Sequence, residues 1–138
     1  MLSKKAQYAF HALTYLSERK EQGSTLISEI SDRRGISLKF LEHILLEMKK
    51  GGILESKKGK GGGYYLIKDE KDIPLAKIIR LIYGPIALLP CVSLNYYEPC
   101  EHCDEKTCGL NDVMAEVRDA NLKILENKTL ADILPKSK

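Results

Sequence analysis

The chain lacks an apolar run long enough to span a membrane, so no membrane-spanning helix and no membrane partner are expected. Its first residues, Met1-Leu2-Ser3-Lys4-Lys5, also lack the apolar core of a secretory signal peptide. We therefore expect a cytoplasmic protein. The 138 residues suffice for one compact domain, or for a small domain with an added oligomerisation arm.

Motifs for hydrolysis and phosphoryl transfer are missing as well. The chain contains no recognisable Ser/His/Asp set, no nucleotide-binding glycine motif and no paired acid/base signal. We therefore expect that it is not an enzyme.

Basic residues are concentrated in the first half of the chain. The net charge is only +3, but residues 1–71 hold 14 Lys/Arg against 9 Asp/Glu, whereas residues 72–138 hold 8 against 10. Five lysines lie within residues 49–60, opposed only by Glu55: Lys49, Lys50, Lys57, Lys58 and Lys60. This half is the predicted nucleic-acid face, the alternative being an ordinary solvated surface.

Apolar periodicity predicts a mainly α-helical fold with one β-hairpin. Helices are expected near residues 3–17, 26–34, 38–50, 74–84 and 110–127, and strands at 53–56 and 64–67. Three helices followed by a hairpin is the order of a winged helix-turn-helix, whose third helix enters the major groove. Residues 85–108 are expected to form an irregular loop before the long last helix. Thr129 to Asp132 resembles a capping box.

The third helix and the hairpin tip carry the candidate DNA-binding residues. On the helix side opposite its apolar face, these are Ser37, Lys39, Phe40, Glu42 and His43. Glu42 can accept a hydrogen bond from a cytosine amino group, and His43 can contact a base or a phosphate. At the hairpin tip, the candidates for phosphate or minor-groove contact are Lys57, Lys58, Lys60, Gly61 and Gly62. A plain tight turn is the alternative explanation of the glycines.

All four cysteines lie in one short segment with the spacing C-x8-C-x2-C-x4-C: Cys91, Cys100, Cys103 and Cys108. Four thiolates suffice for zinc or for an iron–sulfur cluster, and the spacing does not decide between them. Acidic residues surround the thiols and disfavour free thiolates, a penalty that a bound cation would reverse. We therefore favour a metal or cluster site over a thiol switch or four unrelated packing cysteines.

Four segments, in order along nearly the whole chain, resemble the Rrf2 family of bacterial transcription regulators, a group that includes IscR, NsrR and CymR. They are Leu2-Ser3-Lys4 with Tyr8-Ala9, the helix segment 36–42, the hairpin segment 56–66 and the segment 129–132. The resemblance implies a homodimer on a pseudo-palindromic operator of double-stranded DNA, with helix 110–127 crossing the partner. It also implies that Cys91, Cys108 and one middle cysteine hold a [2Fe–2S] or [4Fe–4S] cluster.

The chain departs from the family pattern at several positions. Cluster-binding relatives commonly have three cysteines in this loop, so either Cys100 or Cys103 could be the middle ligand. Asn111 stands where regulators of the IscR type have a histidine, and Gln7 stands where other relatives recruit a carboxylate from the partner. The fourth ligand would then most simply be the fourth cysteine. Lys58 replaces the usual arginine, which keeps the charge without the planar guanidinium.

The sequence thus predicts a DNA-binding transcriptional regulator that senses iron–sulfur, redox or nitrosative state through a cysteine-bound cluster. Residues 1–84 would form the winged helix-turn-helix domain, 85–108 the sensor loop, and 109–138 the dimerisation helix and tail. One alternative is the same regulator with a zinc site or a thiol/disulfide switch without a cofactor. The other, a small electron-transfer protein, leaves the lysine-rich hairpin unexplained.

Overall fold

The computed structural model describes residues 2–135, so Met1 and the tail residues 136–138 of the predicted domains lie outside the described part. Its main elements, in chain order, are α1 (Lys4–Glu18), α2 (Ile27–Arg34), α3 (Leu38–Lys50), β1 (Leu54–Lys57), β2 (Gly63–Leu66), α4 (Leu75–Ile82) and α5 (Gly109–Asn127). Short 3-10 turns add η1 (Lys20–Gln22), η2 (Glu70–Asp72), η3 (Pro90–Val92) and η4 (Leu130–Ile133). The predicted fold class is confirmed: mainly α-helical, with a two-stranded antiparallel hairpin.

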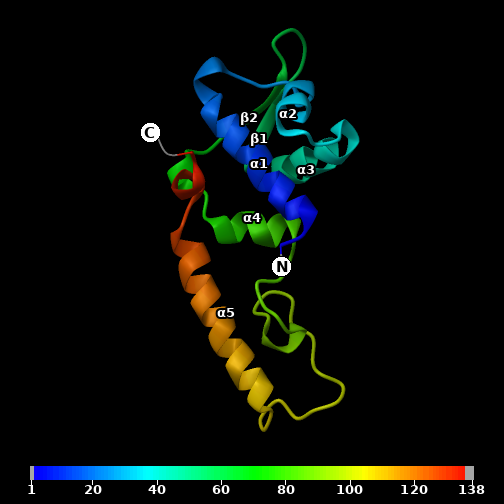
Figure 1. Ribbon diagram of the computed structural model, residues 1–138, viewed down its shortest axis with the longest axis vertical. Coiled ribbons are helices and arrows are strands. Elements are labelled where there is room, and N and C mark those ends of the chain that lie inside the picture. Colours follow the sequence, from blue (N-terminus) through cyan, green and yellow to red (C-terminus); the bar gives the residue numbers. More distant parts are fainter. Residues whose placement is uncertain (1, 136–138) are drawn as a thin grey trace.

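Two parts are visible in Figure 1. The hairpin and the first four helices pack together at one end, whereas α5 leads away from them with the loop 85–108 alongside it. The start of α5 therefore lies at the end of the molecule opposite the hairpin tip, and its last turn returns to the helical cluster. No helix among residues 2–135 is both long and apolar enough to cross a membrane.

Local capping sets the helix boundaries as the sequence predicts. The Ser3 and Ser37 side chains accept hydrogen bonds from the backbone N–H groups of Ala6 and Phe40, at 3.1 and 3.3 Å. Gly35 ends α2 in the left-handed conformation, at φ +65°. The capping box predicted at Thr129 is present. Other boundaries differ from the predicted ones by one or two residues, because each is decided by the last hydrogen bond of its element.

The core lies where α1, α3 and α4 meet. Leu41, Ile44, Leu45 and Met48 of α3 are all fully buried, as their helical spacing predicts. The facing side of α1 is lined by three buried alanines, Ala6, Ala9 and Ala12, which allow neighbouring helices to approach closely. Removal of these apolar side chains from water is the main force that holds α3 in place.

The segment after α5 returns to this core. Leu75 N–H donates to the Lys128 carbonyl, and Leu130 N–H donates to the Ile73 carbonyl, both at 2.9 Å. Leu130 is completely buried. The C-terminal end of α5 is therefore attached to the first turn of α4.

Candidate DNA-binding face and cysteine cavity

The predicted residues of α3 divide into a solvent-facing set and one packing residue. Ser37, Lys39, Glu42 and His43 are all exposed on α3, as a base-reading surface requires. Phe40 is half-buried, and its ring meets the Tyr8 ring edge-on with centroids 5.7 Å apart. Phe40 therefore braces α3 against α1, and the other four side chains form the accessible face.

The basic residues after α3 also differ in their surroundings. Lys49 is tied to β1, because its Nζ donates to Ser56 Oγ at 2.7 Å and lies 3.5 Å from the Glu55 carboxylate. A hydrogen bond from the Ser56 backbone N–H lowers the pKa of Glu55, and Lys49 adds a smaller lowering. The hairpin lysines Lys57, Lys58 and Lys60 are exposed, and none of them forms an ion pair within residues 2–135.

The glycines at the hairpin tip allow the backbone to form its tight turn. Gly62 is buried, its N–H donates to the Gly59 carbonyl at 2.9 Å, and a Cβ there would overlap the Lys57 carbonyl oxygen. Gly61 is exposed at φ +75° with open space around its Cα. Of the two glycines predicted to contact DNA, Gly61 thus remains accessible, whereas Gly62 closes the turn.

A backbone pairing that sequence reasoning missed holds the hairpin base. Thr25 and Tyr64 exchange two backbone hydrogen bonds, of 2.9 and 2.8 Å, so that the segment before α2 lies against β2. Gly63, at φ +132°, lies so close to this segment that a Cβ would overlap the Thr25 carbonyl. Only the glycine at position 63 hints at this approach in the sequence.

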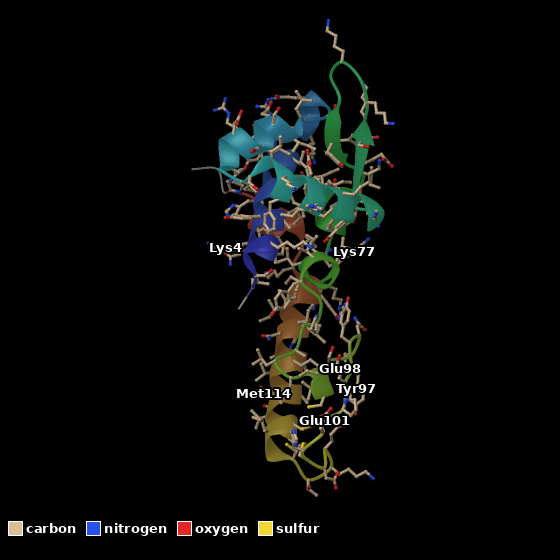
Figure 2. All side chains as sticks on the ribbon, turned by 90° about the vertical axis from the view of Figure 1, so that its right-hand side faces the viewer. Lys4, Lys77, Tyr97, Glu98, Glu101 and Met114 are labelled. Atoms are coloured by element: carbon tan, nitrogen blue, oxygen red, sulfur yellow. The ribbon has the colours of Figure 1, made fainter. Side chains whose placement is uncertain are left out.

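The four cysteines line one cavity of about 230 Å³ between η3, the following loop and the start of α5. Its remaining wall is mostly apolar: Leu89, Pro90, Pro99 and Leu110, with Glu98 as the charged member. Cys91 and Cys108 are half-buried, whereas Cys100 and Cys103 are exposed. Figure 2 shows the loop residues Tyr97, Glu98 and Glu101 beside Met114 of α5, far from Lys4 and Lys77 in the helical cluster.

The pKa values of Cys100 and Cys103 depend more on neighbouring thiols than on the surrounding carboxylates. Hydrogen bonding to Cys100, followed by burial, raises the pKa of Cys103 to about 12, and contact with Cys108 adds to the effect. The hydrogen bond with Cys103 lowers the pKa of Cys100, and a smaller lowering comes from the backbone N–H of His102. Glu105 acts mainly on Tyr97, whose pKa rises because its hydroxyl donates to that carboxylate at 2.7 Å. Cys103 thus neighbours both Cys100 and Cys108.

Asn111 completes the set of groups around the sulfur atoms. Its side-chain Nδ2 donates to Cys91 Sγ and its backbone N–H donates to Cys108 Sγ, each at 3.4 Å. By contrast, Gln7 lies outside this cavity, and its Nε2 donates to the Leu2 carbonyl at 3.0 Å.

The donor set fits a thiophilic group, because four thiols share one apolar cavity and thiolates suit zinc and iron–sulfur clusters alike. Within residues 2–135, no three Cys, His, Asp or Glu side chains already converge as metal ligands do. The thiols that could hold such a group are therefore Cys91, Cys100, Cys103 and Cys108, brought closer together than they lie here.

Comparison with known proteins places the whole chain in one group. A family model described as Rrf2, iron-dependent transcriptional regulator, matches residues 2–136. An HTH-type transcriptional regulator, rrf2-like, from Rhodobacter capsulatus is 41% identical over 138 residues, which cover 97% of this chain and 92% of the relative.

Two further matches are more distant. The HTH-type transcriptional regulator IscR of Serratia proteamaculans is 29% identical over 133 residues, covering 96% of this chain and 78% of that protein. Among solved structures, CymR, the global cysteine regulator of B. subtilis, superposes with a TM-score of 0.78 at 25% identity, covering 96% of this chain and 95% of CymR.

Proposed function

The chain belongs to the Rrf2 family of transcriptional regulators, and from that premise we propose a homodimeric DNA-binding regulator whose cysteine segment senses iron–sulfur, redox or nitrosative state. Like its relatives, it is a transcriptional regulator and not an enzyme. The observation that carries the sensing proposal is the single cavity shared by all four cysteines at the start of α5.

On the DNA side, α3 would enter the major groove. Lys39, Glu42 and His43 follow one another at helical spacing and are all exposed, so they can reach base edges, with Ser37 at the helix start. The unpaired hairpin lysines, next to the accessible Gly61, would contact phosphates or the minor groove of a pseudo-palindromic operator.

The partner of α5 would be a second copy of the chain. Leu110, Val113 and Ile124 of α5 are 57%, 52% and 58% exposed, and only Leu122 of that helix is buried. An apolar stripe of this length is rarely left in water, and a two-fold dimer would cover it with the same stripe of the partner. We propose the same functional division as the sequence predicts: residues 1–84 for DNA binding, 85–108 for sensing and 109–138 for dimerisation.

The sensor would use Cys91, Cys108 and the middle cysteines as ligands. An iron–sulfur cluster would supply a centre that gains and loses electrons and reacts with nitric oxide. The description of the Rrf2 family as iron-dependent transcriptional regulators and the likeness to IscR support iron over zinc. Cys103 is a hydrogen-bonding neighbour of both Cys100 and Cys108, so it would serve as the middle ligand.

A thiol switch without a cofactor is the second candidate, favoured by the contact between Cys100 and Cys103. Their oxidation would form one disulfide, with two protons and two electrons passing to an external oxidant such as a peroxide.

The signal would travel through α5. Cys108 caps this helix, and the residue after its other end, Lys128, bonds to Leu75 at the start of α4. Leu81 of α4 lies against Gly51, which ends α3. A shift of α5 would therefore move α3 and change the spacing of the two recognition helices, which must match one turn of DNA.

The decisive experiment begins with the ultraviolet–visible spectrum of anaerobically purified protein, with iron, acid-labile sulfide and zinc assayed on the same sample. Visible absorption with iron and sulfide supports the cluster. A colourless sample with stoichiometric zinc supports a zinc site, and a metal-free sample that resists reconstitution supports the thiol switch.

The second step measures affinity for an operator selected from random DNA, with and without the cofactor. Cys91→Ala should change operator affinity without changing the helical content. Replacement of the three hairpin lysines by alanine should lower affinity and reduce the slope of log affinity against log salt by about 0.9 per lost phosphate contact. Lys123→Ala, on exposed α5, is the matched control. Equal affinity with and without the cofactor contradicts the coupling.

A further inference from the structure

Asn111 contacts the sulfur atoms of two cysteines that are distant in the sequence. Its Nδ2 donates to Cys91 Sγ and its backbone N–H donates to Cys108 Sγ, each at 3.4 Å. Cys91 belongs to η3, whereas Cys108 is the N-cap residue of α5. One asparagine therefore joins the two ends of the cysteine segment. Neither the DNA-binding face nor the apolar stripe of α5 accounts for these contacts.

The geometry of the first helical turn explains how one residue reaches both sulfur atoms. Cys108 occupies the N-cap position, usually held by Ser, Thr, Asp or Asn, and its sulfur accepts the N–H of the third helical residue. That residue is Asn111, whose side chain tilts toward the helix N-terminus, as all helical side chains do. This direction brings its amide to η3.

A second contact holds η3 against the same face of α5. Arg118, two helical turns after Asn111, donates through Nη1 to the Val92 carbonyl at 2.8 Å. Arg118 touches backbone, whereas Asn111 touches sulfur. Asn111 is thus an anchor that contacts the cysteine sulfur atoms, whereas Arg118 is an anchor that does not.

The charge around the sulfur atoms makes an uncharged donor useful. Glu98 lines the cavity, and Glu101, Asp104 and Glu105 belong to the same segment, so a group held by four thiolates would be strongly negative. Hydrogen bonds to sulfur withdraw electron density and favour the reduced state of a bound cluster. The Asn111 amide donates such a hydrogen bond to Cys91 and carries no positive charge that would offset the charge of a thiolate ligand.

We propose that Asn111 is the positioning residue of the cysteine site, holding Cys91 and Cys108 as a pair and raising the reduction potential of the group they bind. The proposal rests on the proposed sensing function. Here Asn111 acts as an N–H donor to two ligands and not as a ligand itself.

The test compares anaerobically reconstituted wild type with three variants. Asn111→Leu removes the donor, Asn111→Asp keeps the shape but replaces the amide by a carboxylate, and Arg118→Met removes the other anchor of η3. Both Asn111 variants should have a more negative midpoint potential than wild type and Arg118→Met. In competition with a chelator, they should also hold iron about 10- to 100-fold more weakly, as expected when a group that orients a ligand is removed.

Three results would overturn the proposal. The first is a wild-type potential in Asn111→Leu. The second is a shift in Asn111→Asp alone, which would be an effect of added charge. The third is an equal shift in Arg118→Met, which would reduce Asn111 to a mechanical anchor.

Failure of the proposed function itself is recognised separately, since wild type would then take up no iron or sulfide. The pairing is tested in that case on metal-free protein with Cys100 and Cys103 replaced by serine. Dibromobimane becomes fluorescent when it bridges two neighbouring thiols, here Cys91 and Cys108. Slower bridging in Asn111→Leu than in the parent supports the positioning role, and equal bridging overturns it.

Discussion

Glu70 is a buried carboxylate whose charge should stabilise the fold around the N-terminal helix. It lies in η2 at 6% exposure, accepts a hydrogen bond from the Ser17 hydroxyl at the end of α1, and pairs with Lys20 Nζ at 2.6 Å. Burial by itself raises the pKa of Glu70, but the hydrogen bonds from Lys20 and Ser17 outweigh it and lower the pKa from 4.5 to about 2.

The size and sign of the effect follow from this shift. A lowering from 4.5 to about 2 corresponds, at roughly 1.4 kcal/mol per pKa unit, to an upper bound of about 3.5 kcal/mol. Because Lys20 is 40% exposed, solvent screening should reduce this to about 1–2 kcal/mol. A lowered folded-state pKa means that the stabilisation is fully present above pH 4.5 and is lost as the pH falls toward 2.

Glu70→Gln keeps the side-chain shape and removes the charge. The expected result is a loss of about 1–2 kcal/mol in the free energy of unfolding at pH 7, and a difference from wild type that shrinks as the pH falls below 4.5. The measurement is urea unfolding followed by circular dichroism at several pH values and one protein concentration, because a dimer's stability depends on concentration.

The matched control is Glu21→Gln, an exposed glutamate in η1 that should change the unfolding free energy by less than about 0.5 kcal/mol. A Glu70→Gln variant as stable as wild type at pH 7 would refute the reasoning. So would a deficit that stays constant from pH 7 to pH 3, since the charge of Glu70 would then not be its source.

Three further predictions concern the hairpin, the C-terminal turn and α5. Gly63→Ala should destabilise the fold by about 1–3 kcal/mol and weaken operator binding, because at φ +132° a Cβ would overlap the Thr25 carbonyl. Urea unfolding should show a smaller loss of stability for the control Gly61→Ala, whose Cβ would lie in open space. Thr129→Val removes the hydroxyl half of the capping box and should lower the melting temperature, at a cost of about 1 kcal/mol. Ile124→Glu should shift sedimentation toward a monomer while Lys123→Glu does not, and an unchanged dimer would contradict the assigned interface.

The DNA-binding face illustrates how far sequence patterns reach. The apolar face of α3 and its Ser37 cap are local signals, set by side chains within one or two helical turns, and both are as predicted. The same pattern predicts that Phe40 contacts DNA, and this role of Phe40 stays a prediction. Its packing on Tyr8 depends on how α1 crosses α3, which no local pattern encodes.

The cysteine site shows the same limit. The spacing of the cysteines and their acidic neighbours predicted a shared site, and the four thiols do line one cavity. From the sequence, Asn111 is recognisable only as the residue that replaces the histidine of IscR-type regulators. Its contact with Cys91 appears only when η3 folds back against α5, so its relation to sulfur required the tertiary structure.

The sequence by itself determined the order of the helices and the hairpin, most of their caps, the family and the clustering of lysine and cysteine, because each is encoded by residue type and short-range spacing. The tertiary structure alone decided that Gly62 and Gly63 serve internal contacts, that Glu70 is charged and buried, and that Asn111 joins two sulfur atoms. These features depend on groups from distant segments meeting in space. Their energies come from burial and hydrogen bonding that exist only once the chain is folded.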